Sequence, residues 1–412
     1  MRILLLSVTS PFPPNNGVKM RSWAILQALA DEGHEIDLVT FQDANQPAET
    51  SDELARVCRQ VIWIPHKLKS VSSSRDYFGR LQHLFASTPY GTHGTKSQAM
   101  AGKISSLLSE GSIDLVLSEQ TDLLVNLPDS LPVPLVVDFH NVDYLIFERY
   151  LQFEKNPAKK LYAYLESRKV RAWERIACQR SAAAMACSDH DRALLQKLHP
   201  AAPILAIPNV VDVESYVPQD AEDAQKILFQ GGMDWYPNRD AVDFFASEIY
   251  PLIRKEMPDV RFVVAGRNPP EDFRERLSRV PGIEFTGTVP DMRKVVADAA
   301  VCVIPLRMGS GTRLKILEGG AMAKPMVSTR LGAEGLDFVQ GKEIMLEDEP
   351  AAFAGNVVRL LRDSYLRKTL GAGARRRVEM DYSYGALRTA VRNLLRQLPS
   401  RRSSILENVS SG

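Results

Sequence analysis

Several signatures that would place this chain in a common protein class are missing from its sequence. The four cysteines, Cys58, Cys178, Cys187 and Cys302, are scattered, with no Cys-x-x-Cys pair and no neighbouring pair of histidines. This spacing excludes a zinc finger or a disulfide framework and suits a reducing compartment. The 51 Lys and Arg residues nearly balance the 50 Asp and Glu residues, giving a net charge of +1. A chain without excess positive charge has no general attraction for nucleic acid, so we expect no such partner.

Long apolar runs are also missing. Residues 3–8 resemble the core of a signal peptide, but the run is short and leads into Pro11-Phe12-Pro13-Pro14 without a cleavage site of small residues. A buried first strand explains it better. No stretch approaches the roughly 20 apolar residues that a spanning helix needs. We therefore expect a cytoplasmic protein that is at most peripheral at the inner face of a membrane.

The glycine fingerprint of dinucleotide-binding enzymes is absent as well. That fingerprint places Gly-x-Gly-x-x-Gly directly after the first strand, with an acidic residue about 20 positions later. The first loop of this chain has only Gly17. A nicotinamide-dependent oxidoreductase is therefore excluded.

What the sequence does contain is a regular alternation of apolar strand-like runs and helix-period segments. The first series of predicted strands covers residues 2–8, 36–41, 61–64, 115–118, 135–138, 183–187 and 204–207. The second series covers residues 226–231, 260–265, 283–286, 300–304 and 325–328. Alternation of this kind is typical of doubly wound parallel sheets, and 412 residues suffice for two of them.

The domain boundaries follow from this pattern. We expect an N-terminal Rossmann-like domain over residues 1–210 and a C-terminal one over residues 220–378, joined by the polar stretch 208–225. A last helix, residues 384–398, carries an apolar stripe at helical spacing that needs a partner to cover it. The Arg- and Ser-rich tail, residues 399–412, is predicted to be disordered.

The segment from Cys302 to Glu318 carries the most chemistry. A strand is followed by a loop with Gly309 and Gly311, and a helix is expected to start near Thr312. A helix N-terminus offers unpaired N–H groups, and glycines let an anion approach the backbone closely. Arg313 and Lys315 would lie in the same first turn, where cations are unfavourable unless an anion offsets them. A diphosphate bound by these five residues satisfies that requirement.

Glu318 follows one turn later in the same predicted helix. Its two acceptor oxygens suit the paired hydroxyls of a ribose. The alternative is an ordinary ion pair with Arg313 or Lys315 on a solvated helix face. The glycine loop and both cations favour the ribose.

This stretch resembles the signature of the retaining GT-B glycosyltransferases of family 4. The family pattern has two Glu residues with seven residues between them, followed by small residues and Pro-Val-Val-Ser. Here Glu318 takes the second position, and Pro325-Met326-Val327-Ser328 follows it. Ser310 stands where the first Glu would face the donor sugar. The sequence from Gly309 to Glu318 is similar to that of a known branch of the family.

The resemblance implies an α/β fold of the GT-B type. Two Rossmann-like domains would face each other across a cleft, and the C-terminal helix would return to the N-terminal domain. It implies sugar transfer with retention from a nucleoside-diphosphate sugar, which is a co-substrate, with no cofactor and no essential metal ion. The acceptor would be a glycan, a lipid-linked molecule or a small molecule.

The resemblance also assigns roles in the N-terminal domain. Gly17 would present its backbone N–H to the donor phosphate, or simply be a glycine in a turn. Lys19 and Arg21 face the cleft or are solvated. His140, after the strand that ends at Asp138, would be a catalytic contact beside the transferred sugar, and Glu318 is the second catalytic candidate. A structural hydrogen-bonding role is the alternative for His140.

In the C-terminal domain, relatives hold the diphosphate with an Arg and a Lys where this chain has Met233 and Asn238. We expect Arg313 and Lys315 to replace them, with Gly232 still allowing close approach of phosphate. The resemblance assigns the remaining contacts to the donor base and ribose to Gly266, Arg267 and Val289.

The segment 159–180 reads as a basic amphipathic helix. Such a helix can lie on an anionic membrane. Glu166 and Glu174 dilute its charge, however, so an ordinary surface helix packed on the sheet is the favoured interpretation.

Two rival functions remain open from the sequence. A nucleotide-sugar epimerase with the same fold would bind the same donor. A binding protein that has lost turnover along with the first Glu would do so too.

Overall fold

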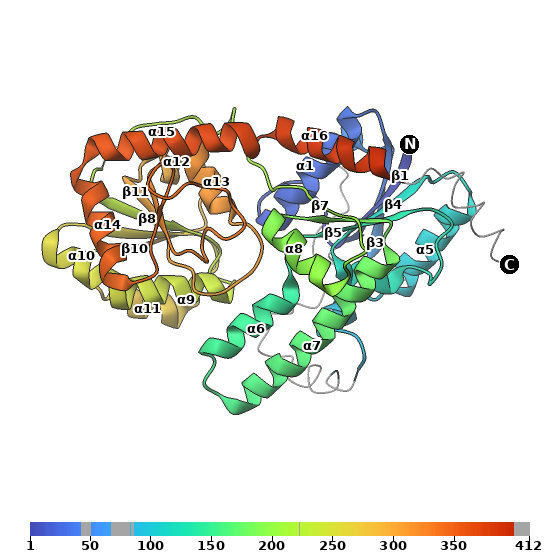
Figure 1. Ribbon diagram of the computed structural model, residues 1–412, viewed down its shortest axis with the longest axis horizontal. Helices are drawn as coiled ribbons and strands as arrows, with labels where there is room; N and C mark the ends of the chain where they lie inside the picture. Colours follow the sequence, from blue (N-terminus) through green and yellow to red (C-terminus); the bar gives the residue numbers. More distant parts are fainter. Residues whose placement is uncertain (43–50, 67–82, 84–85, 222, 399–412) are drawn as a thin grey trace. The chain divides into compact units, whose positions relative to one another are not determined.

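The computed structural model describes residues 1–412 except 43–50, 67–82, 84–85, 222 and 399–412. The chain forms two compact units (Figure 1). The N-terminal unit comprises Met1–Pro208 and Leu387–Gly412, and the C-terminal unit comprises Asn209–Ala386. The tail predicted to be disordered, residues 399–412, lies outside the described residues.

The described strands of the N-terminal unit form one parallel sheet with the order β3-β2-β1-β4-β5-β6-β7. They are β1 (Arg2–Ser7), β2 (Glu35–Gln42), β3 (Gln60–Pro65), β4 (Leu115–Glu119), β5 (Leu135–Phe139), β6 (Ala183–Ala186) and β7 (Ile204–Ala206). The central strands are buried on both faces, which is why their sequences are continuous apolar runs.

Helices connect these strands and cover the sheet. They are α1 (Gly17–Asp31), α2 (Asp52–Val57), α4 (Tyr90–Thr95), α5 (Gln98–Ser109), the short η1 (Thr121–Asn126), α6 (Asp143–Phe153), α7 (Pro157–Arg180) and α8 (Asp189–Leu198). Helices α6 and α7 pack side by side as a hairpin that projects from the unit (Figure 1). No described helix combines the length and the apolar character needed to cross a bilayer.

The described strands of the C-terminal unit form a second parallel sheet, in the order β10-β9-β8-β11-β12-β13. They are β8 (Lys226–Gln230), β9 (Arg261–Ala265), β10 (Ile283–Gly287), β11 (Val301–Ile304), β12 (Met326–Ser328) and β13 (Met345–Leu346). Its helices are α9 (Tyr236–Phe244), η2 (Phe245–Ile249), α10 (Tyr250–Glu256), α11 (Glu271–Ser278), α12 (Met292–Ala297), α13 (Leu314–Ala321), α14 (Pro350–Arg362) and α15 (Ser364–Asp381).

Both sheets therefore have the Rossmann-like strand order, with the direction of winding reversed beside the first strand. In open sheets of this type, ligands bind outside the carboxyl ends of the strands at the reversal point. That point lies between β1 and β4 in the N-terminal unit and between β8 and β11 in the C-terminal unit. The loops after these four strands are where a site is expected.

The predicted strands agree with the structure to within about two residues. Helix α1 begins at Gly17, where the Asn16 side chain caps it by accepting from the Lys19 N–H at 3.1 Å. Helix α13 begins at Leu314, two residues after the predicted start near Thr312. Strand β13 was not predicted, since a two-residue strand has no periodic pattern.

The last helix, α16 (Tyr384–Gln397), belongs from Leu387 onward to the N-terminal unit, the partner that the family resemblance implied for its apolar stripe. Glu32 follows α1 and accepts hydrogen bonds from Arg392 and Arg388 of α16, at 2.7 and 2.6 Å. These two guanidinium groups lower the pKa of Glu32 to about 2. The side chains of the buried stripe are Leu387, Val391 and Leu394.

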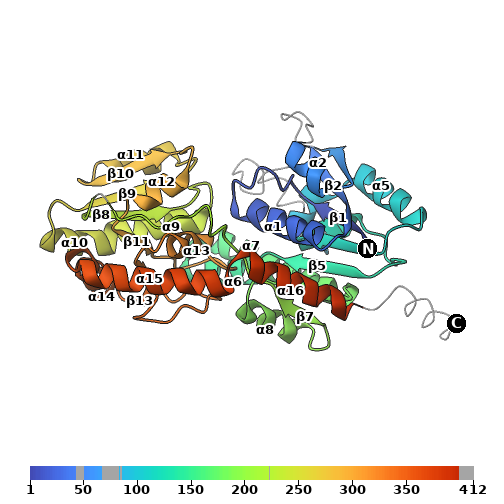
Figure 2. The same ribbon diagram turned by 90° about the horizontal axis from the view of Figure 1, so that it is seen from above.

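Figure 2 shows α15 and α16 from above, where the chain leaves the C-terminal unit and returns to the N-terminal one. The polar stretch after Pro208 is held by the C-terminal unit: the Val211 N–H donates to the Tyr382 carbonyl at 3.1 Å. The Arg375 guanidinium donates to the carbonyls of Tyr216, at 2.6 Å, and Val213, at 3.0 Å.

Candidate active site

The glycine loop after β11 and the loop after β8 lie side by side, because β8 and β11 are hydrogen-bonded neighbours. Gly309 and Gly311 have φ angles of +114° and +74°, a region that favours glycine. A Cβ atom on Gly309 would lie 3.0 Å from the Arg313 guanidinium. Glycine is therefore favoured at both positions by the backbone conformation, and at Gly309 also by the close approach of the Arg313 side chain.

The sequence predicted that Arg313 lies in the first turn of α13. In the structure Arg313 is the N-cap residue, just before that turn, and its side chain makes no capping hydrogen bond. Its Nη1 donates to the carbonyl of Ser310 and, at 2.7 Å, to that of Gly311. The neighbouring Thr312 hydroxyl accepts from the Asn209 side chain at 2.6 Å. The Arg313 guanidinium thus stabilises the loop that contains it. Its contact with a diphosphate stays a prediction.

Lys315 reaches across to the loop after β8. Its ammonium donates to Asn238 Oδ1 at 2.9 Å and lies 4.1 Å from the centre of the Phe229 ring. A Cβ atom on Gly231 would be only 3.1 Å from it. Burial, followed by repulsion from Arg313, lowers the pKa of Lys315 to about 7. An anion bound here would restore its charge.

Asn238 and Met233 are the positions at which the resemblance predicted the diphosphate clamp of relatives. Asn238 holds the Lys315 ammonium and also donates to the Gly232 carbonyl at 2.9 Å. Met233 is fully buried in the core instead of facing the loop. A Cβ atom on Gly232 would come within 3.6 Å of Arg267, which pairs with Asp234 at 3.6 Å. Arg267 thus lies beside Gly232, and its contact with the donor base stays a prediction.

Glu318 is held on both of its oxygens. The Tyr216 hydroxyl donates to Oε1 at 3.1 Å, and the Gln230 amide donates to Oε2 at 2.6 Å. Burial raises the pKa of Glu318 to about 7, against the opposing effects of Tyr216 and Lys315. Sequence reasoning missed Tyr216, because it lies in a polar stretch without a periodic pattern.

The position of Gly266, after β9, requires a glycine because the backbone of Gly231 approaches it closely. Its φ is +153°, and a Cβ atom would lie 1.9 Å from the Gly231 carbonyl oxygen. This contact brings the loops after β8 and β9 together. Val289 is half-buried and follows β10, which lies one strand further from β11 than β9 does.

In the N-terminal unit, a second polar cluster gathers at the ends of β4 and β5. Arg21 of α1 donates two hydrogen bonds to the Asp138 carboxylate, at 2.8 and 2.6 Å, and a third to the Ile207 carbonyl at 2.9 Å. His140 Nε2 lies 3.1 Å from the same carboxylate. Burial would raise the pKa of Asp138, but Arg21 and His140 together hold it near 2.

Arg21 is therefore buried, which neither alternative from the sequence anticipated. Glu119, at the end of β4, was also missed; burial raises its pKa to about 7, against the opposing effect of His140. Gly17 is the exposed first residue of α1 and does not have a positive φ, so a turn does not explain it. Its N–H stands at a helix N-terminus. The sequence showed a polar strand end here, but not which groups pair.

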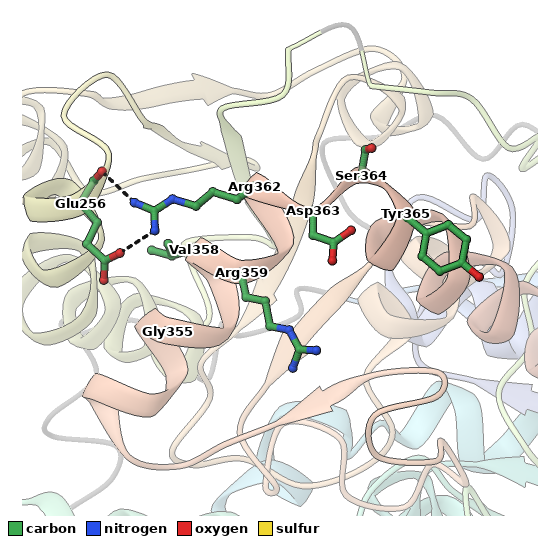
Figure 3. Close-up of a pocket in the computed structure, with 8 residues that line it drawn as sticks. All are labelled: Glu256, Gly355, Val358, Arg359, Arg362, Asp363, Ser364 and Tyr365. Carbon is green, nitrogen blue, oxygen red and sulfur yellow. Dashed lines mark hydrogen bonds and ion pairs between the residues drawn. The ribbon is translucent and has the colours of Figure 1, made fainter.

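The cavity in Figure 3 lies elsewhere in the C-terminal unit. It encloses about 550 Å³ beside α10, α14 and the start of α15, where Arg362 pairs with Glu256 at 2.9 Å. Because α10 ends just before β9 begins, this cavity lies at the amino ends of the strands. It is separate from the site loops. Within the described residues, no three His, Cys, Asp or Glu side chains are placed to hold a metal ion.

Comparison with known families and structures agrees with this arrangement. The family model described as Glycosyltransferase Family 4 matches residues 15–215, and that described as Glycosyl transferases group 1 matches residues 224–363. The chain belongs to the GT-B glycosyltransferases of family 4. It is accordingly an enzyme of the glycosyltransferase class, as its motif predicted.

Two curated relatives are similar in sequence. An uncharacterized 44.6 kDa protein in the cps region of Klebsiella pneumoniae is 19% identical over 87% of this chain and 90% of its own length. The phosphatidyl-myo-inositol mannosyltransferase of Mycolicibacterium smegmatis is 27% identical over 42% of this chain and 46% of its own length.

Solved structures share the fold of both units. Sucrose-phosphate synthase from Thermosynechococcus elongatus has a TM-score of 0.71 at 17% identity, covering 97% of this chain and 99% of its own. The HepE protein of Anabaena, solved in complex with UDP-glucose, has a TM-score of 0.66 at 14% identity, covering 97% of this chain and 100% of its own. At these identities the likeness shows the fold alone.

Proposed function

We propose that this glycosyltransferase moves a hexosyl group from a nucleoside-diphosphate sugar to an acceptor hydroxyl with retention of anomeric configuration. The observation that carries the proposal is the half-buried Lys315 ammonium, which lies beside Gly231 and Asn238 at the reversal point of the sheet. A buried cation whose pKa is lowered to about 7 gains most from a doubly charged ligand.

The donor is assigned to the C-terminal unit. Lys315 binds the diphosphate, with the backbone N–H groups of Gly232, Gly309 and Gly311 as further donors. Glu318 accepts from the ribose hydroxyls through the lone pairs that Tyr216 and Gln230 leave available.

The reaction balances without any further reactant. The acceptor oxygen forms a bond to the anomeric carbon while the bond from that carbon to the β-phosphate oxygen breaks. The acceptor proton passes to the departing nucleoside diphosphate, and the products are a glycoside and that diphosphate. Lys315 stabilises the charge that develops on the leaving group. No cofactor or metal ion enters this scheme.

The acceptor and the sugar hydroxyls are assigned to the remaining predicted residues. His140, oriented by Asp138, contacts the transferred sugar, and Ser310 takes the place of the missing first Glu beside it. Glycans, lipid-linked molecules and small molecules are the acceptor classes to test, in a cytoplasmic role in glycan, polysaccharide or glycolipid synthesis. The UDP-glucose complex of the Anabaena protein makes UDP-hexoses the first donors to try.

A donor panel followed by thermal unfolding tests the binding step. The right sugar nucleotide raises the melting temperature by mass action. Radiolabelled donor then separates the rival functions: transfer releases nucleoside diphosphate and labelled glycoside, whereas an epimerase leaves the nucleotide attached to a new sugar. Carbon–proton coupling at the anomeric centre of the product reports retention or inversion.

Two variants locate the site, with one matched control. Glu318→Ala should abolish donor binding with folding intact, and His140→Ala should lower turnover with donor binding retained. Glu275→Ala, on the exposed face of α11, should change neither. Full donor binding by Glu318→Ala, or full turnover by His140→Ala, would overturn the respective assignment.

A further inference from the structure

The projecting α6–α7 hairpin exposes apolar side chains along one stripe of α7. The exposed fractions are 61% for Leu161, 47% for Tyr164 and 36% for Leu165, and Ile176 is exposed by 37%. Arg168 and Arg175 lie on the same stripe, because positions three, four and seven apart share one face of a helix. We call the stripe from Leu161 to Ile176 the hairpin face.

The carboxylates of α7 point the other way. Glu166 is 2% exposed and accepts from the Tyr90 N–H, while Glu174 is 1% exposed and accepts from the Asp143 N–H at 2.6 Å. They therefore do not dilute the charge of the exposed side, which reverses the expectation from the sequence. Residues 155–180 carry eight cations and these two buried carboxylates. Three of the cations pair within the hairpin: Lys159 with Glu154, Arg171 with Glu148 and Lys169 with Glu166. The cations are Lys155, Lys159, Lys160, Arg168, Lys169, Arg171, Arg175 and Arg180.

We propose that the hairpin face binds the surface of an anionic lipid bilayer. The stripe runs along α7 of the projecting hairpin, and an elongated exposed stripe of this kind suits a flat surface (Figure 1). Its length from Leu161 to Ile176 is about 22 Å at 1.5 Å per residue. Apolar and aromatic side chains flanked by Lys and Arg are the composition of helices that lie in the headgroup region.

Other occupants fit less well. A second copy of the chain would oppose the same cations to one another, at a cost in repulsion. A folded acidic protein would neutralise the charge but would leave Leu161 and Tyr164 without a matching apolar pocket. The proposal does not depend on sugar transfer, because it concerns the N-terminal unit and a ligand without nucleotide.

Co-sedimentation of the full chain with vesicles tests the proposal. Vesicles of phosphatidylcholine with a third of phosphatidylglycerol should bind the protein, and vesicles of phosphatidylcholine alone should bind at least tenfold less. Each cation near an anionic surface contributes roughly fivefold to affinity, an effect that salt screens. Equal binding to both compositions, or binding to neither, would overturn the proposal.

Two sets of substitutions separate charge from insertion. Reversing three cations should lower the affinity for anionic vesicles more than a hundredfold; this variant is Lys160→Glu, Arg168→Glu and Arg175→Glu. Removing the apolar groups should lower it about tenfold and make the residual binding fully salt-sensitive; this variant is Leu161→Ser, Tyr164→Ser and Leu165→Ser.

Matched controls lie on exposed positions of the C-terminal unit. Three charge reversals, Lys294→Glu, Arg330→Glu and Lys368→Glu, and two apolar removals, Tyr365→Ser and Met380→Ser, should bind vesicles like the parent. If the controls lose as much as the hairpin variants, the surface is wrongly placed. All variants should keep the melting temperature and the nucleoside-diphosphate affinity of the parent, so failure here is distinguishable from failure of the proposed function.

A fluorescent label reports insertion directly. The four native cysteines are buried, so Leu161→Cys can be labelled selectively with an environment-sensitive dye. Its emission should shift to the blue on addition of anionic vesicles, whereas a label on Met380→Cys should not shift. An unshifted Leu161 label would mean that the face only adsorbs by charge, and insertion would be refuted.

Discussion

The polar clusters of the two units occupy equivalent places, at the reversal point of a Rossmann-like sheet, yet they handle charge in opposite ways. In the N-terminal unit, Arg21 and His140 lie against Asp138 and hold its pKa near 2, although burial raises the pKa of the neighbouring Glu119 to about 7. In the C-terminal unit, burial drives both Lys315 and Glu318 toward their neutral forms, each with a pKa of about 7. The Arg21–Asp138 ion pair is complete within the protein.

The second cluster is under-compensated, and this difference is informative. A buried ion pair that satisfies itself orients its neighbours and gains little from a ligand. A buried cation without a full counter-charge is ready to bind an anion. The comparison therefore separates a positioning ion pair from a cluster that we propose to bind a ligand, and four measurements can break or sharpen it.

The largest effect is expected where the complete cluster is broken. Arg21→Met leaves the Asp138 charge buried with only His140 beside it, which should lower the free energy of unfolding by about 3–5 kcal/mol. Urea-dependent hydrogen exchange of the β1, β4 and β5 amides measures this for the N-terminal unit alone. Arg261→Met, which breaks an exposed pair with Asp223, should cost less than about 1 kcal/mol, measured by exchange of the β8 and β9 amides of its own unit. Equal costs for the two variants would remove the distinction between the clusters.

The next effect concerns ligand binding by the incomplete cluster. Lys315→Ala removes a charge-assisted contact and should weaken nucleoside-diphosphate binding by about 1.5–3 kcal/mol, with nucleoside binding nearly unchanged. Isothermal titration with both ligands gives the comparison. Lys294→Ala, an exposed lysine of α12, is the control. A Lys315→Ala variant that discriminates the two ligands like the parent would contradict the role of Lys315.

The pH dependence of donor binding sharpens the comparison further. The pKa of Lys315 is lowered to about 7, so the free protein loses this proton above pH 7, and binding a diphosphate must restore it. Affinity should fall by up to about tenfold, or about 1.4 kcal/mol, per pH unit above 7. Calorimetry at pH 8 in buffers of different ionisation enthalpy should show uptake of nearly one proton. Uptake that persists in Lys315→Ala would assign the proton elsewhere.

Lys315 and Glu318 also make the stability of the ligand-free protein depend on pH, in opposite directions. Because the folded pKa of Lys315 lies below its unfolded value, its contribution to stability rises with pH between about 7 and 10.5. Because the folded pKa of Glu318 lies above its unfolded value, its contribution is present below about 4.5 and is lost as pH rises to about 7.

The smallest effect tests the support of Glu318. Tyr216→Phe removes one hydrogen bond to the carboxylate and should cost about 1 kcal/mol of unfolding free energy. It should also raise the pKa of Glu318 further, since the hydroxyl lowers it. Carboxyl chemical shifts across a pH titration measure this. Tyr365→Phe, on exposed α15, should change neither quantity.

Much of the fold could be read from the sequence. Continuous apolar runs such as Ile3–Leu6 are what strands covered on both faces require, so the positions of the longer strands were predictable. The spacing of Leu387, Val391 and Leu394 likewise marked a helix in need of a partner. The glycine loop before Lys315 and Glu318 indicated where we propose the donor binds, because its chemistry is local in the chain.

Only the tertiary structure decided which charges meet. Lys315 and Asn238 are 77 positions apart, and Arg21 and Asp138 are 117 apart, so no local pattern could pair them. The same holds for Glu166 and Glu174, whose burial sets the charge of the hairpin face. A helical period says which residues share a face, but it does not say which face the rest of the protein covers. The sequence by itself determined the elements and the chemistry they carry, whereas long-range packing determined which of those charges are paired, buried or left for a ligand.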